Sequence, residues 1–297
     1  MAQTEGARVA QDEEDSGQLS GVMLAAVAVC LFSTSPVLVA WGAPLNSFEM
    51  TAGRLIVGAL AVWAMAWKVQ QPLFPRRADL PRFAGFGLAA ALHFLCYIAS
   101  LGFTTIAQSL AIVYTAPIFV TIFSATFLDE PIARRKWLGA IITVTGIAVM
   151  VGFEAQMNAR MLFGDALALV SAVTFGIYSV AGRSQRRRYP LFTYAGTVYA
   201  LAALWVLPVA LVTLTPAGYT PRSVMAVLAL GLLPLATGHT LYNAALRRTH
   251  ATTVNLIATQ EVTGGVLLGA LLLGQAPQPN EIAGIIMALA GIAIVLR

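Results

Sequence analysis

Long apolar stretches, each followed by a short polar segment, occupy the chain from Leu19 to its last residue. Each stretch is about 18–24 residues long, the length that an α-helix needs to cross a hydrocarbon layer about 30 Å thick. Inside a bilayer the backbone must satisfy its own hydrogen bonds, so stretches of this length are expected to be helices. The pattern predicts ten membrane spans, at residues 19–40, 47–68, 82–101, 105–128, 135–153, 161–181, 191–213, 223–246, 251–274 and 279–296.

The basic residues distinguish the two ends of these spans. With the N-terminus placed in the cytoplasm, 15 of the 18 Lys and Arg residues fall in cytoplasmic segments. Only Arg160 and Arg222 fall on the opposite side, and Arg54 lies within a span. Cytoplasmic loops of membrane proteins carry such an excess of Lys and Arg. The asymmetry therefore predicts cytoplasmic termini, and it supports ten spans, because one missed span would reverse every later loop.

The composition agrees with a membrane protein and excludes several other classes. Hydrophobic residues make up 58% of the chain and charged residues 10%, whereas soluble domains contain about 25% charged residues. The pI near 9.5 does not indicate nucleic-acid binding, because the basic residues lie in loops between spans. Cys30 and Cys96 lie in apolar stretches and suggest neither a disulfide framework nor a metal site.

The first 18 residues differ from the rest of the chain. They are polar and include four consecutive acidic residues at 12–15. A cleavable signal peptide would begin with a basic region followed by a short apolar core. Residues 1–18 are therefore predicted to form a disordered cytoplasmic tail.

The chain also repeats itself at an offset of 145 residues. Each half contains five spans, an odd number, so the two halves cross the membrane in opposite directions. Inverted repeats are typical of transporters, in which two similar halves alternate access to a central site. The predicted fold is all-α, a polytopic membrane protein with a first five-helix repeat at 19–153 and an inverted second repeat at 161–297. Matched pairs in the two copies are Tyr97 and Tyr242, Gly139 and Gly284, and Gly146 and Gly291.

Several motifs resemble those of a known transporter superfamily. They are Arg54 in the second span, Tyr114-Thr115-Ala116-Pro117 in the fourth, Leu128-Asp129-Glu130-Pro131 leading into Trp137 and Gly139, and a weaker copy at Leu273-Gly274-Gln275. On these residues the chain resembles ten-helix metabolite and amino-acid exporters of the drug/metabolite transporter superfamily, and within it the aromatic amino-acid exporters. The second copy departs from the pattern, since Gln275-Ala276 replaces Glu-Pro and Val262 replaces Pro117.

The resemblance implies export of small metabolites across a bacterial inner membrane. Helices of both halves would line a central cavity, and the fifth and tenth spans would pack outside it. No cofactor is implied. The departures in the second copy leave the fold expectation intact but weaken the expectation of two symmetric gates.

Polar and aromatic side chains inside the predicted spans indicate a cavity near the middle of the membrane. A polar group in lipid costs free energy unless it faces a partner or water. Glu261 lies about ten residues, or roughly 15 Å, from the polar turn at 247–250, which is half the thickness of the hydrocarbon core. The candidate substrate-binding residues are His93, Tyr97, Tyr114, Tyr178, His239, Tyr242, Asn243, Gln260 and Glu261.

These residue types suit a zwitterionic amino acid. Glu261 can bind the ammonium group, and Gln260 and Asn243 can add hydrogen bonds. Arg54 or one of the two histidines can bind the carboxylate, and the tyrosine rings can stack on the side chain. Structural roles stay open for all of them, because Glu261 can brace neighbouring helices and the tyrosines can simply pack.

Arg54 and three prolines are candidates for gating or anchoring. Arg54 lies about seven residues, or roughly 10 Å, inside its span, from where its side chain can also extend outward to water. Pro36, Pro117 and Pro234 fall within spans, where proline removes a backbone hydrogen bond and kinks the helix. Such kinks can serve as hinges, although membrane helices also tolerate them passively.

The predicted function is secondary transport that exports small metabolites, in particular aromatic amino acids or small neutral ones such as threonine, by alternating access. The alternative within transport is an exporter of cationic drugs, which Glu261 and the tyrosines alone would suit. A membrane-embedded enzyme is the alternative from another class, but the catalytic motifs are lacking. The sequence does not distinguish proton-coupled transport from facilitated diffusion. It also leaves open the oligomeric state and the conformation that predominates at rest.

Overall fold

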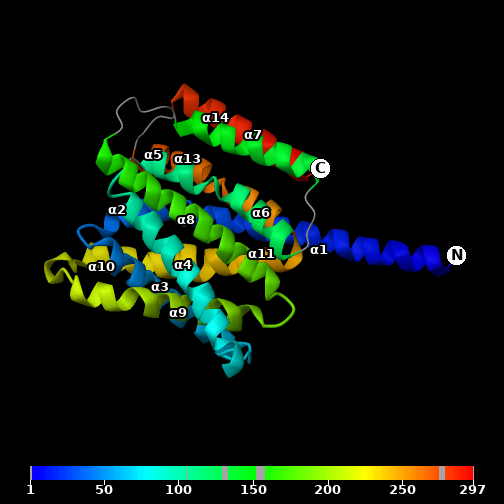
Figure 1. The fold of residues 1–297 in the computed structure, drawn as a ribbon, viewed down its shortest axis with the longest axis horizontal. Helices are drawn as coiled ribbons and strands as arrows, with labels where there is room; N and C mark the ends of the chain where they lie inside the picture. Colours follow the sequence, from blue (N-terminus) through cyan, green and yellow to red (C-terminus); the bar gives the residue numbers. More distant parts are fainter. Residues whose placement is uncertain (1, 105, 129–132, 152–157, 274–277, 297) are drawn as a thin grey trace.

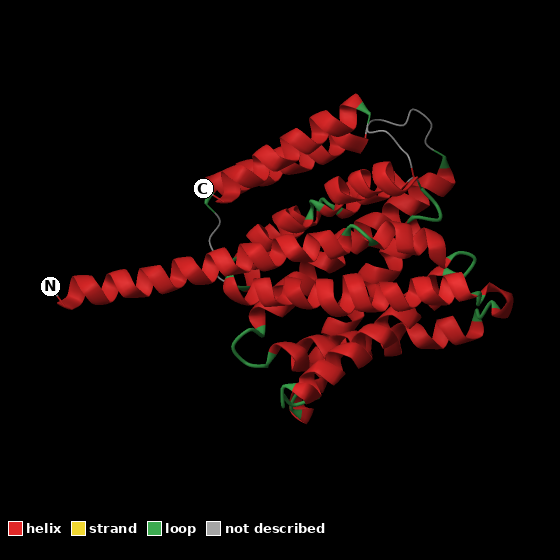
Figure 2. Ribbon diagram, turned by 180° about the vertical axis from the view of Figure 1, so that it is seen from behind, coloured by secondary structure: helices red, strands yellow, loops and turns green. Residues whose placement is uncertain are grey.

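The computed structural model describes residues 2–104, 106–128, 133–151, 158–273 and 278–296. Within these ranges the chain consists of helices joined by short loops and turns, and it contains no strand (Figures 1 and 2). The motif residues Asp129–Pro131 and Gly274–Ala276 lie outside the described residues. The all-α fold predicted from the apolar stretches is confirmed.

The helices follow the two predicted repeats. The first repeat contains α1 (Ala2–Phe32), α2 (Ser35–Gly42), α3 (Ser47–Lys68), the short η1 (Arg77–Asp79), α4 (Leu80–Ser100), α5 (Ile106–Val113), α6 (Ala116–Phe127) and α7 (Arg134–Val151). The second contains α8 (Ala159–Ser184), α9 (Leu191–Val212), the short η2 (Pro216–Gly218), α10 (Pro221–Leu230), the π-helix η3 (Gly231–His239), α11 (Thr240–Arg248), α12 (Ala251–Ala258), α13 (Glu261–Leu273) and α14 (Pro279–Leu296).

Ten spans result because four of them are built from consecutive shorter helices. The first span joins α1 to α2, the fourth α5 to α6, the eighth α10 to α11 through η3, and the ninth α12 to α13. Six helical stretches in the described part of the chain are long and apolar enough to cross a membrane unaided. The predicted turn between the eighth and ninth spans is also observed, since α11 ends at Arg248 and α12 begins at Ala251.

Helix α1 is longer than the first predicted span. It begins at Ala2, so the backbone of the segment expected to be a disordered tail is helical. Figure 1 shows this part projecting from the bundle. The apolar part of the first span begins at Gly17, close to the predicted start.

Three of the broken spans share one feature, a hydrogen bond between a threonine side chain and the backbone at the break. Each break contains a threonine whose hydroxyl group donates a hydrogen bond to a carbonyl oxygen three residues earlier, at the point where the helix is interrupted. Pro36 and Pro117 follow the first two breaks, whereas the third has no proline nearby. The three bonds are Thr34 to Leu31 (2.7 Å), Thr115 to Ile112 (2.7 Å) and Thr259 to Leu256 (2.6 Å).

The prolines differ in their effect on the helix. Pro234 lies inside η3, where the helix widens to π geometry. Pro208 lies inside α9, which continues without a break from Leu191 to Val212. The helix is thus interrupted just before Pro36 and Pro117 and widened at Pro234, whereas it continues through Pro208.

Helices α7 and α14, the fifth and tenth spans, pack against each other along one edge of the molecule (Figure 1). Glycines make this approach possible. A β-carbon at Gly139 would lie 2.6 Å from the carbonyl oxygen of Gly291, and a β-carbon at Gly291 would lie 2.6 Å from that of Gly139. These repeated glycines therefore permit the close approach of the two helices.

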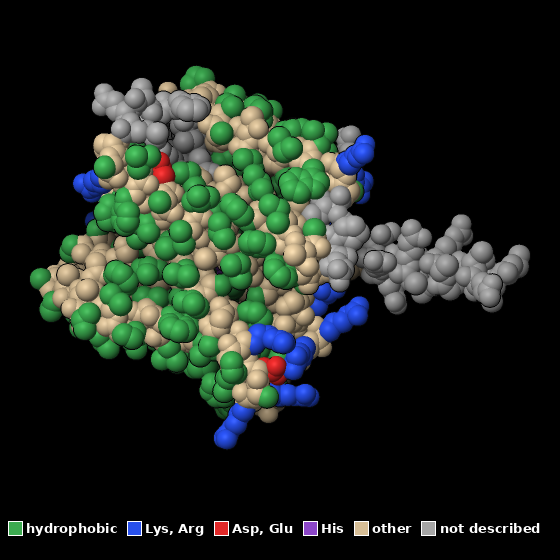
Figure 3. All heavy atoms as spheres, viewed as in Figure 1, with side chains coloured by type: hydrophobic (Ala, Val, Ile, Leu, Met, Phe, Trp, Pro, Cys, Tyr) green, Lys and Arg blue, Asp and Glu red, His purple; other side chains and the backbone are tan. Residues whose placement is uncertain are grey.

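The surface has the pattern of a membrane protein. Figure 3 shows apolar side chains across the middle of the molecule and most Lys and Arg side chains near the end that carries both chain termini. We call this the basic end; it includes Arg76, Arg77, Arg82, Arg187, Arg188, Arg247 and Arg248. The opposite end carries Arg160 and Arg222.

Candidate functional site

A pocket lies at the centre of the bundle, where all four broken spans meet α3, α4 and α8. Its volume is small, about 30 Å³, which is enough for about two water molecules. An amino acid therefore fits only when the walls move apart. The pocket is lined by Phe32, Ser35, Arg54, His93, Phe94, Tyr97, Val113, Tyr114, Phe175, Pro234, His239, Ala258 and Glu261.

Arg54 does not extend outward to water. Its side chain is only 1% exposed, and its guanidinium carbon lies 4.6 Å from the centre of the Phe94 ring. Two guanidinium nitrogens, Nε and Nη1, have no hydrogen-bond partner. The outward orientation left open by the sequence is therefore wrong, because the arginine faces the pocket instead.

Glu261 is the first residue of α13, directly after the break in the ninth span. It lines the same pocket as Arg54 and interacts electrostatically with it and with the hydroxyl groups of Tyr97 and Tyr114. Tyr114 stands at the matching break of the fourth span, between α5 and α6. The two breaks thus place one acidic and one phenolic side chain on the pocket.

The two histidines belong to the pocket wall and pack against aromatic rings. The His93 ring stacks on Phe175 at 4.4 Å, and His239 contacts Phe32 at 4.4 Å and Phe94 at 4.8 Å. His93 Nδ1 lies 3.1 Å from the carbonyl oxygen of Ser171 in α8, to which it can only donate a hydrogen bond. That bond fixes the orientation of the His93 ring.

Three of the predicted binding residues belong to two small hydrogen-bonded clusters instead of the pocket wall, and we call the two clusters together the polar network. Asn243 Nδ2 donates to the Tyr178 hydroxyl (2.5 Å), the Ser179 and Tyr242 hydroxyls share a bond of 2.6 Å, and Asn255 Nδ2 donates to the Tyr242 hydroxyl (3.1 Å). All five side chains are at most 1% exposed. The network lies between the pocket and the basic end, because Asn243 follows His239 toward the end of α11.

The other predicted residues lie beside the pocket without lining it. Gln260 lies in the break before α13, and its carboxamide oxygen accepts a bond from the Thr263 hydroxyl of that helix (2.9 Å). Pro36 directly follows the lining residue Ser35, Pro117 lies three residues after the lining residue Tyr114, and Pro234 lines the pocket itself. The candidate set thus divides into lining residues and supporting residues. Lining the pocket are His93, Tyr97, Tyr114, His239, Glu261, Arg54 and Pro234, and supporting it are Tyr178, Tyr242, Asn243, Gln260, Pro36 and Pro117.

Sequence reasoning missed the phenylalanines Phe32, Phe94 and Phe175. A phenylalanine inside a membrane span carries no signal of its own, because lipid-facing and cavity-facing phenylalanines look alike in sequence. Their position near breaks or polar residues was the available clue, since Phe32 precedes the first break and Phe94 follows His93.

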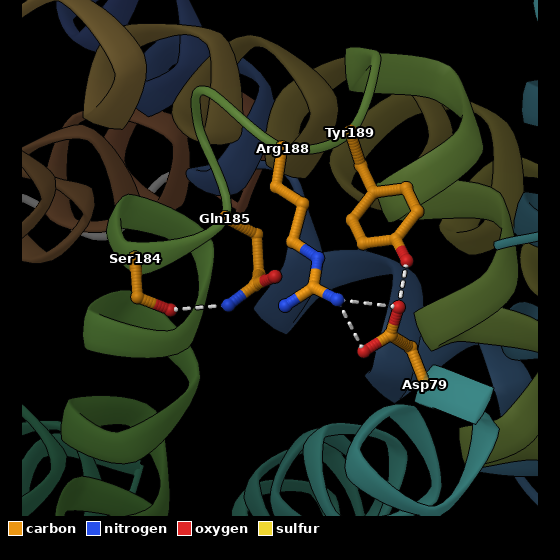
Figure 4. A network of polar contacts seen from close by, with 5 residues as sticks. All are labelled: Asp79, Ser184, Gln185, Arg188 and Tyr189. Atoms are coloured by element: carbon orange, nitrogen blue, oxygen red, sulfur yellow. Dashed lines mark hydrogen bonds and ion pairs between the residues drawn. The ribbon is translucent and has the colours of Figure 1, made fainter. Parts of the chain in front are cut away.

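The basic end is held closed by polar contacts between the two repeats (Figure 4). Asp79, at the end of η1 in the first repeat, binds Arg188 through both carboxylate oxygens at 2.9 Å and also accepts a bond from the Tyr189 hydroxyl. Arg247 donates from Nη2 to the Tyr189 carbonyl oxygen (2.7 Å). We call the contacts among Asp79, Arg188 and Tyr189 the basic-end latch.

Comparison with known proteins identifies the family. Residues 19–152 and residues 162–297 each match the EamA-like transporter family. The chain belongs to this family. The assignment confirms the resemblance to the drug/metabolite transporter superfamily and the prediction of a transporter, not an enzyme.

Individual relatives of this family member are distant. It is 28% identical over 260 residues to a probable terminal-alkyne amino-acid exporter of Streptantibioticus cattleyicolor, with 84% of this chain and 83% of that protein covered. It is 28% identical over 190 residues to the pseudopaline exporter CntI of Pseudomonas aeruginosa, with 64% and 66% covered. A solved crystal structure has the same fold, with a TM-score of 0.78, 21% identity and 93% and 96% of the two chains covered.

Proposed function

We propose that this transporter exports amino acids through the central pocket by alternating access. The observation that carries the proposal is the presence of one buried cation, Arg54, and one carboxylate, Glu261, on the same pocket. A buried charge is costly unless it is paired. A zwitterion brings the complementary charge for each of them. The similarity to exporters, one of them a probable amino-acid exporter, supports the direction and the substrate class.

The rings of the pocket wall supply a surface for the side chain of the substrate. Aromatic or small neutral side chains suit such a wall, because they need no further charged partner. A cationic drug would lie beside the Arg54 guanidinium, which repels it. Arg54 therefore argues against the cationic-drug alternative.

We place the basic end in the cytoplasm, following the excess of Lys and Arg there. The substrate then enters from the end that the polar network and the basic-end latch close. Export requires these contacts to open for loading and to re-form before the opposite end releases the substrate. The small volume of the pocket and the contacts that close the basic end indicate a conformation in which substrate cannot enter from the cytoplasm.

Counterflow in liposomes containing only the purified protein tests the proposal. Radiolabelled phenylalanine, tryptophan and threonine are each exchanged against an excess of the same unlabelled amino acid, with and without a pH gradient. Saturable exchange of at least one is expected, and none above empty liposomes with folded protein would refute amino-acid export. If Glu261 couples protons, the Glu261→Gln variant loses the response to the pH gradient, and full retention would exclude that role.

A further inference from the structure

The Arg54 guanidinium has fewer partners than a buried cation needs. Burial nearly removes its contact with solvent, and its Nε and Nη1 groups donate to no acceptor. Its contact with the Phe94 ring stabilises the positive charge through the ring face but satisfies no N–H group in the manner of an oxygen acceptor. A guanidinium fork in this state matches a carboxylate, which supplies two oxygens in one plane.

Further atoms without partners surround the same pocket. Besides Arg54, the Ser35 hydroxyl, the Tyr97 hydroxyl and Nδ1 of His239 have no hydrogen-bond partner, and each of these side chains is at most 6% exposed. Buried polar groups in folded proteins are nearly always bonded. These groups come from four different helical elements and converge on one pocket, so that a polar ligand bound there can satisfy all of them.

Glu261 supplies the opposite charge without neutralising Arg54 directly. Both residues line the pocket and interact electrostatically, yet no ion pair within 4.0 Å joins them in the described part of the chain. Two opposite charges that share a pocket without touching can hold the two charged groups of a zwitterion between them. A direct ion pair between Arg54 and Glu261 would have left neither side chain available to bind a substrate.

The histidines are poorer partners for a carboxylate than Arg54. His93 Nδ1 is already engaged by Ser171, whose carbonyl oxygen lies at 3.1 Å and whose hydroxyl oxygen lies at 3.0 Å, so the ring has at most one N–H group left for a carboxylate. His239 is packed among the Phe32 and Phe94 rings. Arg54 therefore has the donors that a carboxylate requires.

We infer that Arg54 binds the α-carboxylate of the transported amino acid and Glu261 its ammonium group, so that Arg54 is the residue that distinguishes amino acids from amines. This assignment rests on the proposed function. It also gives the substrate an orientation, with the carboxylate toward α3 and the ammonium group toward the break between α12 and α13.

Three compounds with one ring test the assignment. Phenylalanine carries both charged groups, 2-phenylethylamine lacks the carboxylate, and 3-phenylpropionate lacks the ammonium group. Their dissociation constants are measured on the full-length protein by competition for bound radiolabelled phenylalanine and, for weakly binding variants, by direct titration calorimetry. If the wild-type protein exchanges threonine only, the corresponding set is threonine, 1-amino-2-propanol and 3-hydroxybutyrate.

Arg54→Gln is expected to weaken the binding of phenylalanine and 3-phenylpropionate at least about tenfold, because a buried charge pair is lost, and to change that of the amine by less than about twofold. Glu261→Gln is expected to weaken the binding of phenylalanine and of the amine and to leave the binding of 3-phenylpropionate unchanged. Arg54→Lys keeps the charge but not the fork, so it should restore part of the affinity for the carboxylates. Arg222→Gln serves as the control, since Arg222 also lies over an aromatic ring, that of Trp41, at the opposite end.

The double variant Arg54→Gln/Glu261→Gln distinguishes two residues that each bind the substrate from two residues that only stabilise each other. If each residue holds its own end of the substrate, the two losses in phenylalanine affinity multiply; if they only brace each other, the double variant is no worse than either single one. Equal weakening of all three compounds by Arg54→Gln in protein that elutes as a single species would overturn the inference while leaving amino-acid export standing. Exchange of no amino acid by the wild-type protein would refute the proposed function, and the assignment with it.

Discussion

At the residue scale, buried polar side chains of this transporter belong to two sets with different hydrogen bonding. In one set, Asn243 of α11 bonds Tyr178 of α8, and Tyr242 of α11 bonds Ser179 of α8 and Asn255 of α12. On the pocket wall, in contrast, Ser35, Arg54, Tyr97 and His239 each have polar atoms without a partner, whereas in the first set only the amide oxygens of Asn243 and Asn255 lack one. Since an unsatisfied buried group destabilises a fold, its retention is explained best where a ligand satisfies it. The first set therefore stabilises the bundle, and the second set recognises substrate.

Two tyrosines at matched positions of the repeats give a direct test. Tyr242→Phe removes a hydroxyl that bonds Ser179 and Asn255, so it should lower the free energy of unfolding by about 1 kcal/mol and leave substrate affinity unchanged. Tyr97→Phe removes a hydroxyl without a hydrogen-bond partner, so it should leave the stability unchanged and weaken substrate binding. Thermal unfolding in detergent and binding titrations measure both. A loss of stability in Tyr97→Phe equal to that in Tyr242→Phe would contradict the division into two sets.

At the element scale, interruptions of the helices position polar side chains on the pocket. The breaks at 114–115 and 259–260 are matched in the repeat, and they bring Tyr114 and Glu261 to the pocket. Threonine hydroxyl groups bond the carbonyl oxygens at these breaks, which lets a helix be interrupted inside the membrane at little cost. Non-helical backbone at this depth is tolerated where it lines a cavity, and that is its position here.

Pro117 tests whether the break in the fourth span serves transport. Pro117→Ala restores a backbone N–H and favours a continuous helix through α5 and α6, so stability should be unchanged or higher while the rate of counterflow falls at least about threefold. Pro208→Ala is the matched control, because Pro208 lies in an uninterrupted helix. Comparable rate losses in the two variants would show that the break itself has no special role.

At the scale of the whole molecule, the two repeats meet at the pocket and again at the basic end. The latch joins η1 of the first repeat to the turn between α8 and α9 of the second. Arg188 is 46% exposed, and Asp79 is nearly buried beneath it. An ion pair of this exposure contributes little to stability by itself. Because this ion pair joins two repeats that must move apart during transport, it can favour the conformation in which the basic end is closed.

Asp79→Asn should loosen the basic end without unfolding the bundle. Hydrogen exchange of the backbone at residues 185–190 is expected to rise several-fold in the intact protein, while exchange in the centre of α8 stays the same. Arg187→Gln is the control, since it removes an exposed neighbouring charge that is not part of the latch. Unchanged exchange in Asp79→Asn, or the same rise in the control, would contradict a closing role for the latch.

The sequence predicted much of the fold and about half of the pocket wall. Span positions followed from apolar length, and the depth of Glu261 followed from counting residues along a helix. Glycine pairs in α7 and α14 were expected to pack and do so. Tyr178, Tyr242 and Asn243 were equally plausible as cavity residues, because a polar side chain in a span indicates an environment away from lipid but not which one. Among the phenylalanines of the wall, Phe32 and Phe94 gave only the indirect signal of lying next to a break or a polar residue, and Phe175 gave none.

By itself, the sequence determined that this chain crosses a membrane ten times as two inverted halves, because helix length, loop charge and repeat register are local properties that a bilayer constrains strongly. Only the tertiary structure decided that Arg54 faces Glu261 across a pocket instead of extending outward to water, and that the Tyr242 hydroxyl is bonded while that of Tyr97 is not. Those outcomes depend on how helices far apart in the chain rotate and pack against one another, which hydrophobic periodicity leaves undetermined when lipid and protein interior are equally apolar.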